Sequence, residues 1–467
     1  MTTANLKRSF QSDAWLTGLA ATLGILAVAS CGDTKAANSG QGTPDAGNSI
    51  SDAQTTASNG TYCSLAGSVL WGAAGPTTVP GGPSGAPHLE WLTLPEGFCA
   101  HYFGTVGDAR QLRFAPGGEL FVASPTTATT GGISGQGAAA VVVLPDDNRD
   151  GFADPSITFL GNLPSTQGML FANDSFYFQD DATVRRLAYK KGDRHPTSMP
   201  QVVTTLSSPP ISAPQDPLHW PKALDIAMDG TMYVTNGGSQ DDACISTNPT
   251  RGAIFAFQAD GTTRLVAKGF RNPIALRCEA NHDVCLAVEL ALDYSQDSGG
   301  REKVVVVRPG DDWGYPCCAS RNLPYATATY SDTHVTPNCA NVAADTDSFI
   351  IGHTPFGVDF EQGIWPAPWK GRAFVTLHGV VGSFVGARVV AIALDPTTGA
   401  PMPATELGDG GPKPDSLLQF ATGWDDGQQD HGRPAAIAFA TDGRMFLADD
   451  NLGIIVWIAP ITLKAAQ

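Results

Sequence analysis

The chain contains 467 residues, and its 45 acidic side chains outnumber its 28 lysines and arginines, which gives a formal net charge of −17 at pH 7. A surface that binds nucleic acid phosphates needs a surplus of basic groups, so the charge excludes nucleic acid as an expected partner. Eight cysteines remain besides Cys31, an even number that suits disulfides in an oxidising compartment.

Residues 1–31 are predicted to be a targeting signal. Lys7 and Arg8 precede an apolar run over residues 15–29, and the run leads into the sequence Val-Ala-Ser-Cys that ends at Cys31. This order is typical of a bacterial lipoprotein signal with its lipobox, and the run is too short for a stable membrane span. We therefore expect a lipid anchor on Cys31, which would hold the protein in the periplasm or at the cell surface, attached to the outer membrane.

Residues 32–60 are rich in Ser, Thr, Ala, Gly, Asn and Asp and contain almost no large apolar side chain. Such a segment cannot bury enough apolar surface to fold. We expect it to be a disordered linker between the anchor and a globular domain that spans residues 61–467.

The globular domain repeats one plan six times. In the copy at residues 219–236, a short apolar strand is followed by an Asp-Gly turn and a second β-rich strand, which is the strongest short-range signal for a hairpin. The other five hairpins begin at residues 111, 168, 274, 357 and 435. A third β-rich strand follows each hairpin, at residues 140–144, 183–189, 253–257, 304–307, 389–394 and 454–458.

Antiparallel strands that recur with a period of tens of residues are typical of a β-propeller. The sequence therefore predicts an all-β fold, a six-bladed propeller with four-stranded antiparallel blades. The chain ends after the third strand of the last blade, so the outer strand of that blade should come from the N-terminal side, where residues 98–103 are unassigned. Closing the ring in this way would cover two sheet edges that otherwise favour aggregation.

The cysteines predict one disulfide and leave others open. Cys278 and Cys285 stand on the two arms of the fourth hairpin, and we expect them to pair. The adjacent Cys317 and Cys318 should take separate partners. The candidates for these partners are Cys63, Cys99, Cys244 and Cys339.

Residues 146–154 read Asp-Asp-Asn-Arg-Asp-Gly-Phe-Ala-Asp and place oxygen-bearing side chains at alternate positions, with glycine at the sixth place for a sharp turn. The pattern predicts a structural calcium site on the face away from the propeller mouth. Its ligands would be Asp146, Asn148, Asp150 and Asp154. No glutamate follows at the twelfth place, and an ordinary turn rich in Asn, Asp and Gly is the alternative.

In this topology the start of each innermost strand lies at the same end of the central channel, so polar residues there should converge at one mouth. They are Arg110, Gln111, Gln167, His219, Lys222, Arg271, Asn272, His353, His431 and Arg433. In a funnel with low-dielectric walls such groups favour an anionic or polyhydroxylated ligand. The alternative is that each residue only satisfies backbone groups at a strand start.

Two acidic connections are expected at the same end, one with Asp241 and Asp242 and one over residues 289–297 with Glu289 and Asp293. Loops rich in oxygen ligands suit a hard cation such as calcium, and a solvated acidic loop is the alternative. The chain has no Gly-x-Ser-x-Gly elbow, phosphate loop or zinc spacing among its histidines.

Several motifs occur in a distinctive order. They are His219-Trp220, Asp229-Gly230-Thr231, Gly269-Phe270-Arg271-Asn272-Pro273, Asp312-Trp313-Gly314-Tyr315-Pro316-Cys317, Gly352-His353-Thr354, Leu377-His378-Gly379 and Gly432-Arg433-Pro434. In order and spacing the chain resembles the soluble quinoprotein glucose and sorbosone dehydrogenase family from about residue 94 to residue 458.

The resemblance implies pyrroloquinoline quinone (PQQ) and calcium in the axial funnel, and oxidation of an aldose or sorbosone-like sugar outside the cytoplasm. Electrons would pass to a cytochrome or quinone acceptor. The residues implied at the quinone are Gln111, Gln167, Lys222, Arg271, Asn272, His378 and Arg433. Glu289 and Asp293 would lie near the metal.

Three departures from the family pattern affect the expected site. Gln167 stands where sorbosone-like members have the histidine of Pro-His-Gly, and an amide cannot act as a general base near neutral pH. The segment after His378 lacks an aromatic and a cationic residue, and the metal loop lacks Gly-Pro. Another histidine must then accept the proton, and we expect His219 first and His353 second.

Two other functions remain open. The propeller could have lost the chemistry and bind a carbohydrate or a protein partner at the same funnel. It could instead be a calcium-dependent, lactonase-like hydrolase, because six-bladed propellers also carry such sites. Fold-level similarity alone does not decide among the three functions.

Overall fold

The computed structural model describes residues 60–125, 139–207, 219–238, 251–291, 300–325, 337–344, 347–380, 383–406, 415–425 and 431–465. Contacts separate residues 1–56 from a second unit, residues 57–467. The predicted signal with Cys31 and all but the last residue of the linker lie outside the described residues, so both stay predictions. The described part of the chain has no helix long and apolar enough to cross a membrane.

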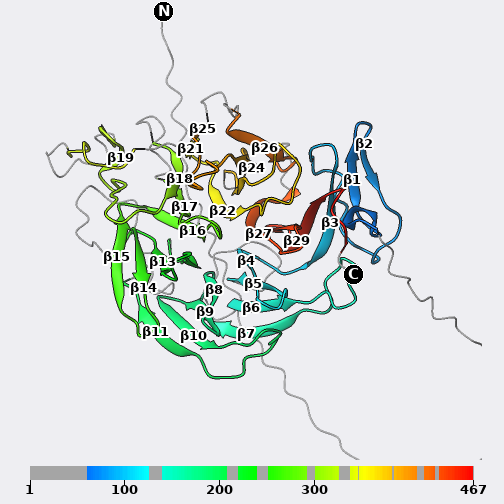
Figure 1. Cartoon of the computed structure of the whole chain (residues 1–467), viewed down its shortest axis with the longest axis horizontal. Helices are drawn as coiled ribbons and strands as arrows, with labels where there is room; N and C mark the ends of the chain where they lie inside the picture. Colours follow the sequence, from blue (N-terminus) through cyan, green and yellow to red (C-terminus); the bar gives the residue numbers. More distant parts are fainter. Residues whose placement is uncertain are drawn as a thin grey trace, which may run out of the picture. The chain divides into compact units, whose positions relative to one another are not determined.

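Six antiparallel sheets surround a central shaft, which confirms the predicted six-bladed β-propeller (Figure 1). The first sheet consists of β4 (Gln111–Phe114), β5 (Leu120–Ser124), β6 (Ala139–Leu144) and β7 (Ile157–Leu163). The second consists of β8 (Met169–Ala172), β9 (Ser175–Asp180), β10 (Thr183–Ala188) and β11 (Gln201–Thr205). The third consists of β12 (Leu224–Ile226), β13 (Met232–Asn236), β14 (Ala253–Phe257) and β15 (Thr263–Lys268).

The fourth sheet begins with β16 (Asn272–Cys278), β17 (Cys285–Leu290) and β18 (Glu302–Val306). The fifth consists of β22 (Pro355–Phe360), β23 (Ala373–Leu377), β24 (Arg388–Ile392) and β26 (Leu417–Ala421). The sixth contains β27 (Pro434–Phe439), β28 (Met445–Asp449), β29 (Ile454–Pro460) and β3 (Phe98–Thr105). The innermost strands are β4, β8, β12, β16, β22 and β27, and five of them are labelled near the centre of Figure 1.

All six predicted hairpins are present, because each innermost strand pairs antiparallel with the next strand of its sheet. Strands in the middle of a blade, such as β6 and β29, are buried along their whole length and read as continuous apolar runs. The turn between β12 and β13 uses Gly230 at a φ of 87°, a conformation that glycine adopts without strain. Asp229 completes this turn by accepting the Thr231 N–H at 2.8 Å.

Six hydrophobic clusters lie between successive sheets and close the ring. The cluster between the last and the first sheet brings Phe446 and Ala448 against Leu112 and Leu120. Burying one large apolar side chain contributes roughly 1.5–3 kcal/mol. Apolar contacts at every sheet-to-sheet interface therefore stabilise the ring.

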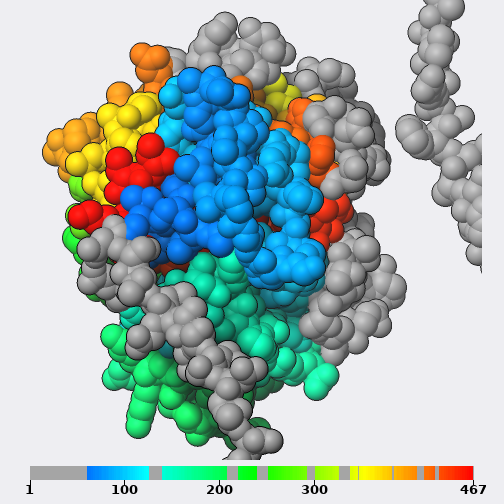
Figure 2. Space-filling model, turned by 90° about the vertical axis from the view of Figure 1, so that its right-hand side faces the viewer, coloured from blue at the N-terminus to red at the C-terminus, as the bar shows by residue number. Residues whose placement is uncertain are grey.

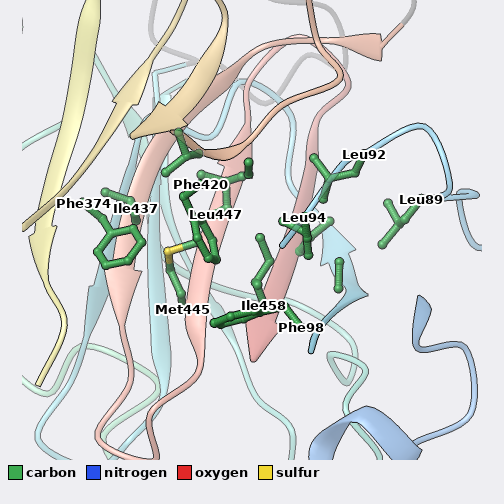
Figure 3. Packing of buried hydrophobic residues seen from close by; sticks show 14 of the residues in the cluster. Leu89, Leu92, Leu94, Phe98, Phe374, Phe420, Ile437, Met445, Leu447 and Ile458 are labelled. Atoms are coloured by element: carbon green, nitrogen blue, oxygen red, sulfur yellow. The ribbon is translucent and has the colours of Figure 1, made fainter. Parts of the chain in front are cut away.

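The N-terminal part of the described chain packs on the sixth sheet. β3 pairs antiparallel with β29, and β1 (Val69–Gly72) and β2 (Gly75–Thr78) extend the same sheet outward. The short 3₁₀ helix η1 (Tyr62–Ser64) precedes them. Figure 2 shows this segment, in blue, over one side of the propeller beside the red C-terminal residues. Figure 3 shows leucines of the segment before β3 reaching the core, among them Leu92 and Leu94.

The fourth sheet contains two short strands that the sequence does not predict. β21 (Asp347–Phe349) pairs antiparallel with β18, and β25 (Ala404–Thr405) pairs parallel with β21. β25 belongs to the connection between β24 and β26, so it links the fourth and fifth blades. The insertion before β21 contains the hairpin of β19 (Cys318–Ser320) and β20 (Leu323–Pro324). Strands of two or three residues carry no periodic signal.

The disulfide Cys278–Cys285 is confirmed. Cys318 pairs with Cys339, one of its predicted candidates. Cys63 and Cys99 pair with each other, so neither is a partner for the adjacent cysteines. Cys317 is disulfide-bonded, and Cys244 lies outside the described residues.

Candidate functional site

The mouth of the shaft is the end at which the innermost strands begin. Gln111 and Asn272 are the first residues of β4 and β16. Gln167, Lys222 and His353 each stand two residues before an innermost strand. The hairpin pattern therefore places predicted site residues at a common end of the propeller.

A narrow cavity of about 20 Å³ lies on the axis at this end. Five blades line it, with Arg110 and Gln111 from the first, Gln167 from the second, and Phe356 from the fifth. Of the residues predicted at the quinone, the cavity brings together Gln111 and Gln167.

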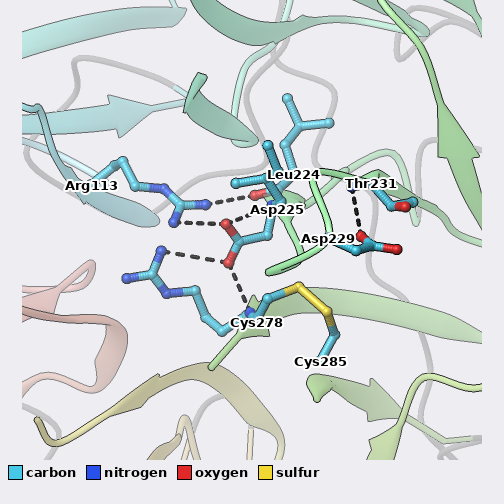
Figure 4. Close-up of a disulfide and its surroundings, with 9 residues drawn as sticks. Arg113, Leu224, Asp225, Asp229, Thr231, Cys278 and Cys285 are labelled. Carbon is cyan, nitrogen blue, oxygen red and sulfur yellow. Dashed lines mark hydrogen bonds and ion pairs between the residues drawn. A yellow bond between two sulfur atoms is a disulfide. The ribbon is translucent and has the colours of Figure 1, made fainter. Parts of the chain in front are cut away.

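Charged side chains cross the shaft beyond this cavity. The axial network consists of Arg113 on β4, Asp225 on β12, Arg277 on β16 and Asp359 on β22 (Figure 4 shows Arg113 and Asp225). Arg113 contacts Asp225 at 3.2 Å, and Asp225 lies 3.7 Å from Arg277. Arg277 donates two hydrogen bonds to Asp359, at 3.0 and 2.8 Å.

Backbone groups extend the axial network to all six innermost strands. Arg113 also donates to the Met169 carbonyl at 3.1 Å and the Leu224 carbonyl at 2.6 Å. Asp359 accepts the Phe439 N–H at 2.8 Å, and Asp225 accepts the Cys278 N–H at 2.9 Å. Arg277 itself lines the axial cavity. The network is thus a floor beneath the cavity, which opens at the mouth as a blind funnel.

One buried carboxylate gathers two arginines and a histidine at the funnel wall. Asp450, fully buried after β28, accepts from Arg110 at 3.0 Å and from Arg433 at 2.7 Å. His378 contacts the same carboxylate at 3.0 Å, and its ring packs on Phe356 at 4.3 Å between centroids. The Arg110 guanidinium lies over the ring of the same Phe356, 5.7 Å from its centroid. The first, fifth and sixth blades meet in this cluster.

The charges of the cluster leave a positive surplus. Burial opposes ionisation of Asp450, but His378, Arg110 and Arg433 outweigh burial and hold its pKa well below the usual range. Burial lowers the pKa of His378 to about 4, so the ring is neutral at neutral pH and donates Nε2–H to Asp450. Burial raises the pKa of Asp108, the other partner of Arg110, to about 7. Two arginines thus share one firmly ionised carboxylate, an arrangement that attracts an anion.

Asp449 precedes Asp450 in the chain and makes the free energy of unfolding depend on pH. Its carboxylate accepts Trp424 Nε1–H at 3.0 Å and the Leu452 N–H at 2.8 Å, and burial raises its pKa from 3.8 to about 7. Between about pH 4 and 7 the native state therefore keeps a proton that the unfolded chain has lost, so this contribution to stability falls as the pH rises.

The variant Asp449→Asn removes the proton binding by Asp449 and so its contribution to the pH dependence of stability. We expect its free energy of unfolding, relative to the wild type, to increase between about pH 4 and pH 7, whatever the constant offset from the substitution. Urea titrations of both proteins at the two ends of this range measure the change. A difference that stays constant with pH would contradict the assignment.

His353 has the geometry of an oriented base. Its Nδ1 lies 2.8 Å from Oε2 of Glu406, which is fully buried and also binds Arg388. Burial raises the pKa of Glu406, but the His353 hydrogen bond and the Arg388 charge outweigh it and the pKa lies below its ordinary value. The ionised carboxylate can only accept, so Nδ1 carries the proton of this hydrogen bond.

The Nε2 atom of His353 has no hydrogen-bond partner among the described residues. No side chain or backbone group of the described residues bonds it, it is not among the buried unpartnered atoms, and the side chain is 10% exposed. Gly386 lies flat against the ring, where any Cβ would collide with it. The Gly379 N–H donates to the His353 carbonyl at 3.0 Å, which places His353 beside His378.

His219 is also held in one tautomer. It is 6% exposed at a φ of 62°, and Nδ1 donates to the Gly238 carbonyl at 3.2 Å. The Gly238 N–H in turn donates to the Arg271 carbonyl at 2.6 Å, so His219 lies beside the predicted quinone residues Arg271 and Asn272. Its partner is a neutral carbonyl, which stabilises an imidazolium less than the carboxylate behind His353 does.

Four buried oxygens near the axis have no partner. The Gln167 side chain is 1% exposed, and its Nε2–H donates to the Ile274 carbonyl at 3.2 Å, which leaves Oε1 unpaired. Asn272 Oδ1 is likewise unpaired. The hydroxyls of Ser165 and Thr166, in the connection that leads to Gln167, are the other two. Of these four residues, Gln167 lines the axial cavity.

Lys222 is not brought to the axial cavity. It is fully buried, and its Nζ donates to the Trp220 carbonyl at 3.3 Å and to Asn236 Oδ1 at 3.2 Å. Burial lowers its pKa to about 7. The structure therefore gives the Lys222 ammonium group contacts inside its own blade.

The predicted calcium ligands Asp146, Asn148, Asp150 and Asp154 all lie in the described part of the chain. In the loop at residues 146–154, Asn148 donates to Asp150 at 2.9 Å, and Asp154 accepts the Asp147 N–H at 2.7 Å. No three His, Cys, Asp or Glu side chains of the described residues lie close enough to hold a metal ion. Calcium at this loop stays a prediction, and the hydrogen bonds within the loop are those of an ordinary Asx turn.

The second predicted metal site cannot be completed. Glu289 on β17 is buried and accepts the Arg271 N–H at 2.8 Å, which places it beside the mouth. Asp293, Asp241 and Asp242 lie outside the described residues. Calcium near Glu289 therefore stays a prediction.

Sequence reasoning missed the acids that hold the site together. Asp450, Glu406 and the carboxylates of the axial network were not candidates, although each pairs with a cation or histidine at the mouth or in the shaft. The pair of acids Asp449-Asp450 at the end of a predicted strand is the sequence feature that could have indicated Asp450 as a site residue. No sequence feature indicates Glu406, because it follows a strand of only two residues.

Comparison with known proteins gives a partial family match and a shared fold. The family described as "Domain of unknown function (DUF7133)" matches residues 89–284. The sequence matches no curated protein at a significant level.

Solved structures share the propeller. A calcium structure of a Trichoderma reesei carbohydrate-active enzyme of family AA12 is 18% identical with a TM-score of 0.61, covering 79% of this chain and 97% of that chain. The holo form of the pyranose dehydrogenase PQQ domain from Coprinopsis cinerea is 15% identical with a TM-score of 0.61, covering 80% and 98%. The PQQ-bound aldose sugar dehydrogenase from Streptomyces coelicolor is 16% identical with a TM-score of 0.51, covering 78% and 99%. At these identities the similarity establishes the fold alone.

Proposed function

We propose that the protein is a sugar oxidoreductase that works with PQQ in the blind axial funnel and oxidises an aldose or sorbosone-like sugar. The observation that carries the proposal is the arginine pair, Arg110 and Arg433, held on the single carboxylate of Asp450 at the funnel wall. Similar propellers include a PQQ-bound aldose sugar dehydrogenase, which supports this choice of reaction.

The residues at the mouth fit an anionic quinone. PQQ carries three carboxylates, so its site needs cations and hydrogen-bond donors. Arg110 and Arg433 supply cations with a net positive surplus, and Arg271 and Gln111 stand at the same end of the shaft. PQQ, when bound, accepts the two electrons taken from the sugar. A cytochrome or quinone acceptor would then remove them, and calcium beside Glu289 belongs to the same proposal.

The proton of the sugar hydroxyl needs a separate acceptor, since Gln167 cannot take it. We assign this step to His353, whose side chain is 10% exposed and whose Nδ1–H is held by Glu406 at 2.8 Å. The developing imidazolium would be stabilised by the carboxylate behind it. His219 is the alternative acceptor.

The test uses the purified protein with added PQQ and calcium. We expect a quinone absorbance band that bleaches when D-glucose or another aldose is added. Arg433→Met should weaken quinone binding about 10–100-fold, because a hydrogen bond to a charged group contributes about 1.5–3 kcal/mol. Arg264→Met, at an exposed arginine on the outer strand β15, is the matched control and should leave binding unchanged.

The absence of a quinone band, or equal quinone affinity in Arg433→Met and the wild type, would overturn the proposal. Gln167 favours a second function, a propeller that binds a carbohydrate without oxidising it. Sugar binding by a protein that takes up no quinone would support that function.

A further inference from the structure

We propose that a second cavity, on the face opposite the mouth, binds an organic cation, a primary amine with an apolar body. This base cavity has a volume of about 440 Å³, compared with about 20 Å³ for the axial cavity, and the two share no lining residue. Its volume is in the range of sites that bind small molecules. The inference goes beyond the proposed oxidation and does not depend on it.

The base cavity lies where the ring of blades closes. The turn between β4 and β5 lines it with Gly118 and Glu119 from the first blade. The turn between β27 and β28 lines it with Asp442 from the sixth blade. These turns follow the far ends of the innermost strands, whose starts form the mouth. Tyr62 and Ala465, near the two ends of the described chain, also line the cavity.

Part of the lining is apolar. Phe114 and Phe446 meet edge to face with their ring centroids 5.1 Å apart, and Phe103 meets Phe446 in the same way at 5.0 Å. Leu120 and Leu144, which pair across β5 and β6, line the same cavity. The apolar body of a ligand can bury surface against these side chains, and aromatic rings also attract a cation.

Two arginines of the lining already have a carboxylate partner. Arg194 donates two hydrogen bonds to Asp147, one of them at 2.7 Å. Arg444 donates to Asp442 at 3.0 Å, and its guanidinium lies 4.4 Å from the ring centroid of Tyr62. Each of these ion pairs is neutral overall, so neither arginine supplies a surplus of positive charge for an anion.

Two further carboxylates have no such partner. Glu119 Oε2 has no hydrogen-bond partner among the described residues, and Oε1 lies 3.9 Å from Arg194, too far for a hydrogen bond. Asp146 Oδ2 lies 3.8 Å from Arg444, and burial raises the pKa of Asp146 to about 6. The side chains of Glu119 and Asp146 are 11% and 12% exposed. Four acids and three arginines line the base cavity, which gives a formal charge of −1.

This combination selects an organic cation. No three His, Cys, Asp or Glu side chains in the described part of the chain are close enough to hold a metal ion. An ammonium group supplies three N–H donors for a carboxylate, and a ligand with a second carboxylate in its place would be repelled. Phe114 pairs with Leu120, the residue after Glu119, so the ring and the carboxylate are neighbours in the lining. We infer that the ammonium group lies at Glu119 and the apolar body lies on Phe114.

The test measures binding of benzylamine to the purified full chain without added quinone, by calorimetry and saturation-transfer NMR at neutral pH. Benzyl alcohol has the same ring without the charge and should bind at least ten-fold more weakly. Glu119→Gln should weaken benzylamine binding at least ten-fold, because it removes the charge from the acceptor. Glu96→Gln, at an exposed acid that does not line the cavity, is the matched control and should bind as the wild type does.

Equal affinity for benzylamine and benzyl alcohol, unchanged affinity in Glu119→Gln, or no binding of benzylamine by the wild type would overturn the inference. Should Glu119→Gln fail to fold, a structure of the wild type with benzylamine decides instead. An ammonium group at Glu119 supports the site, and benzylamine bound only elsewhere refutes it. Quinone uptake and aldose oxidation are separate measurements at the mouth, so their failure would refute the proposed function and leave the base cavity unaffected.

Discussion

Replacing His353 with asparagine is expected to lower the kcat of the PQQ-loaded protein by roughly 10²–10⁴-fold, the usual contribution of a general base. Asparagine keeps a polar group of similar size but has no lone pair that takes a proton at neutral pH. Quinone binding should stay unchanged, because the arginine pair is held by Asp450 and not by His353. Steady-state kinetics with an aldose and a dye acceptor, together with quinone titration, measure both quantities.

A matched control for this prediction exists at the other end of the shaft. His282 contacts Glu279 at 2.8 Å in the hairpin between β16 and β17, with the same atoms as the pair of His353 and Glu406. His282→Asn therefore removes a similar pair far from the mouth and should leave kcat unaltered. If His353→Asn retains wild-type kcat and His219→Asn loses it, the proton acceptor is His219 and our assignment is wrong.

Glu406 is expected to act through His353 as a positioning residue. Glu406→Gln keeps an acceptor for Nδ1–H but removes the charge that stabilises the imidazolium, so the rise of kcat with pH should shift to lower pH. Addition of imidazole should partly restore turnover to His353→Ala and not to Glu406→Gln. A merely structural role for this pair would leave the pH profile where it is in the wild type.

The placement of the mouth residues could be predicted because it depends on local patterns. Asp-Gly turns and β-rich runs define the start of each innermost strand, and the propeller topology then brings those starts together. Gln111 and Gln167 reach the cavity for this reason. Lys222 occupies an equivalent position but does not, because its ammonium group is bonded to Trp220 and Asn236 in its own blade.

The partners of these residues could not be predicted from the same patterns. Arg110 meets Asp450 across 340 residues of chain, and His353 meets Glu406 through the connection that also forms β25. Such pairs arise from the closure of the ring and the sharing of a strand between blades. A single sequence contains no periodicity that encodes either feature. The sequence therefore favours His219, whereas the structure places a carboxylate behind His353.

The axial network carries the second large effect that we expect. Asp359 receives two hydrogen bonds from Arg277 and the Phe439 N–H, and it is 6% exposed. Among the described residues, Asp359→Ala would leave the Arg277 guanidinium with only the 3.7 Å contact to Asp225 and would leave the buried Phe439 N–H without its acceptor. Removing one partner of a buried ion pair costs about 3–5 kcal/mol of the free energy of unfolding.

Urea unfolding followed by tryptophan fluorescence measures this loss, with Asp283→Ala as the control. Asp283 is an exposed acid in the hairpin between β16 and β17, and its removal should change stability by less than about 0.5 kcal/mol. The double variant Arg277→Met with Asp359→Leu should recover much of the loss, since a buried ion pair replaced by apolar groups often costs little. Equal losses for Asp359→Ala and Asp283→Ala would show that the charges in the shaft are solvated, and the funnel would then have no floor.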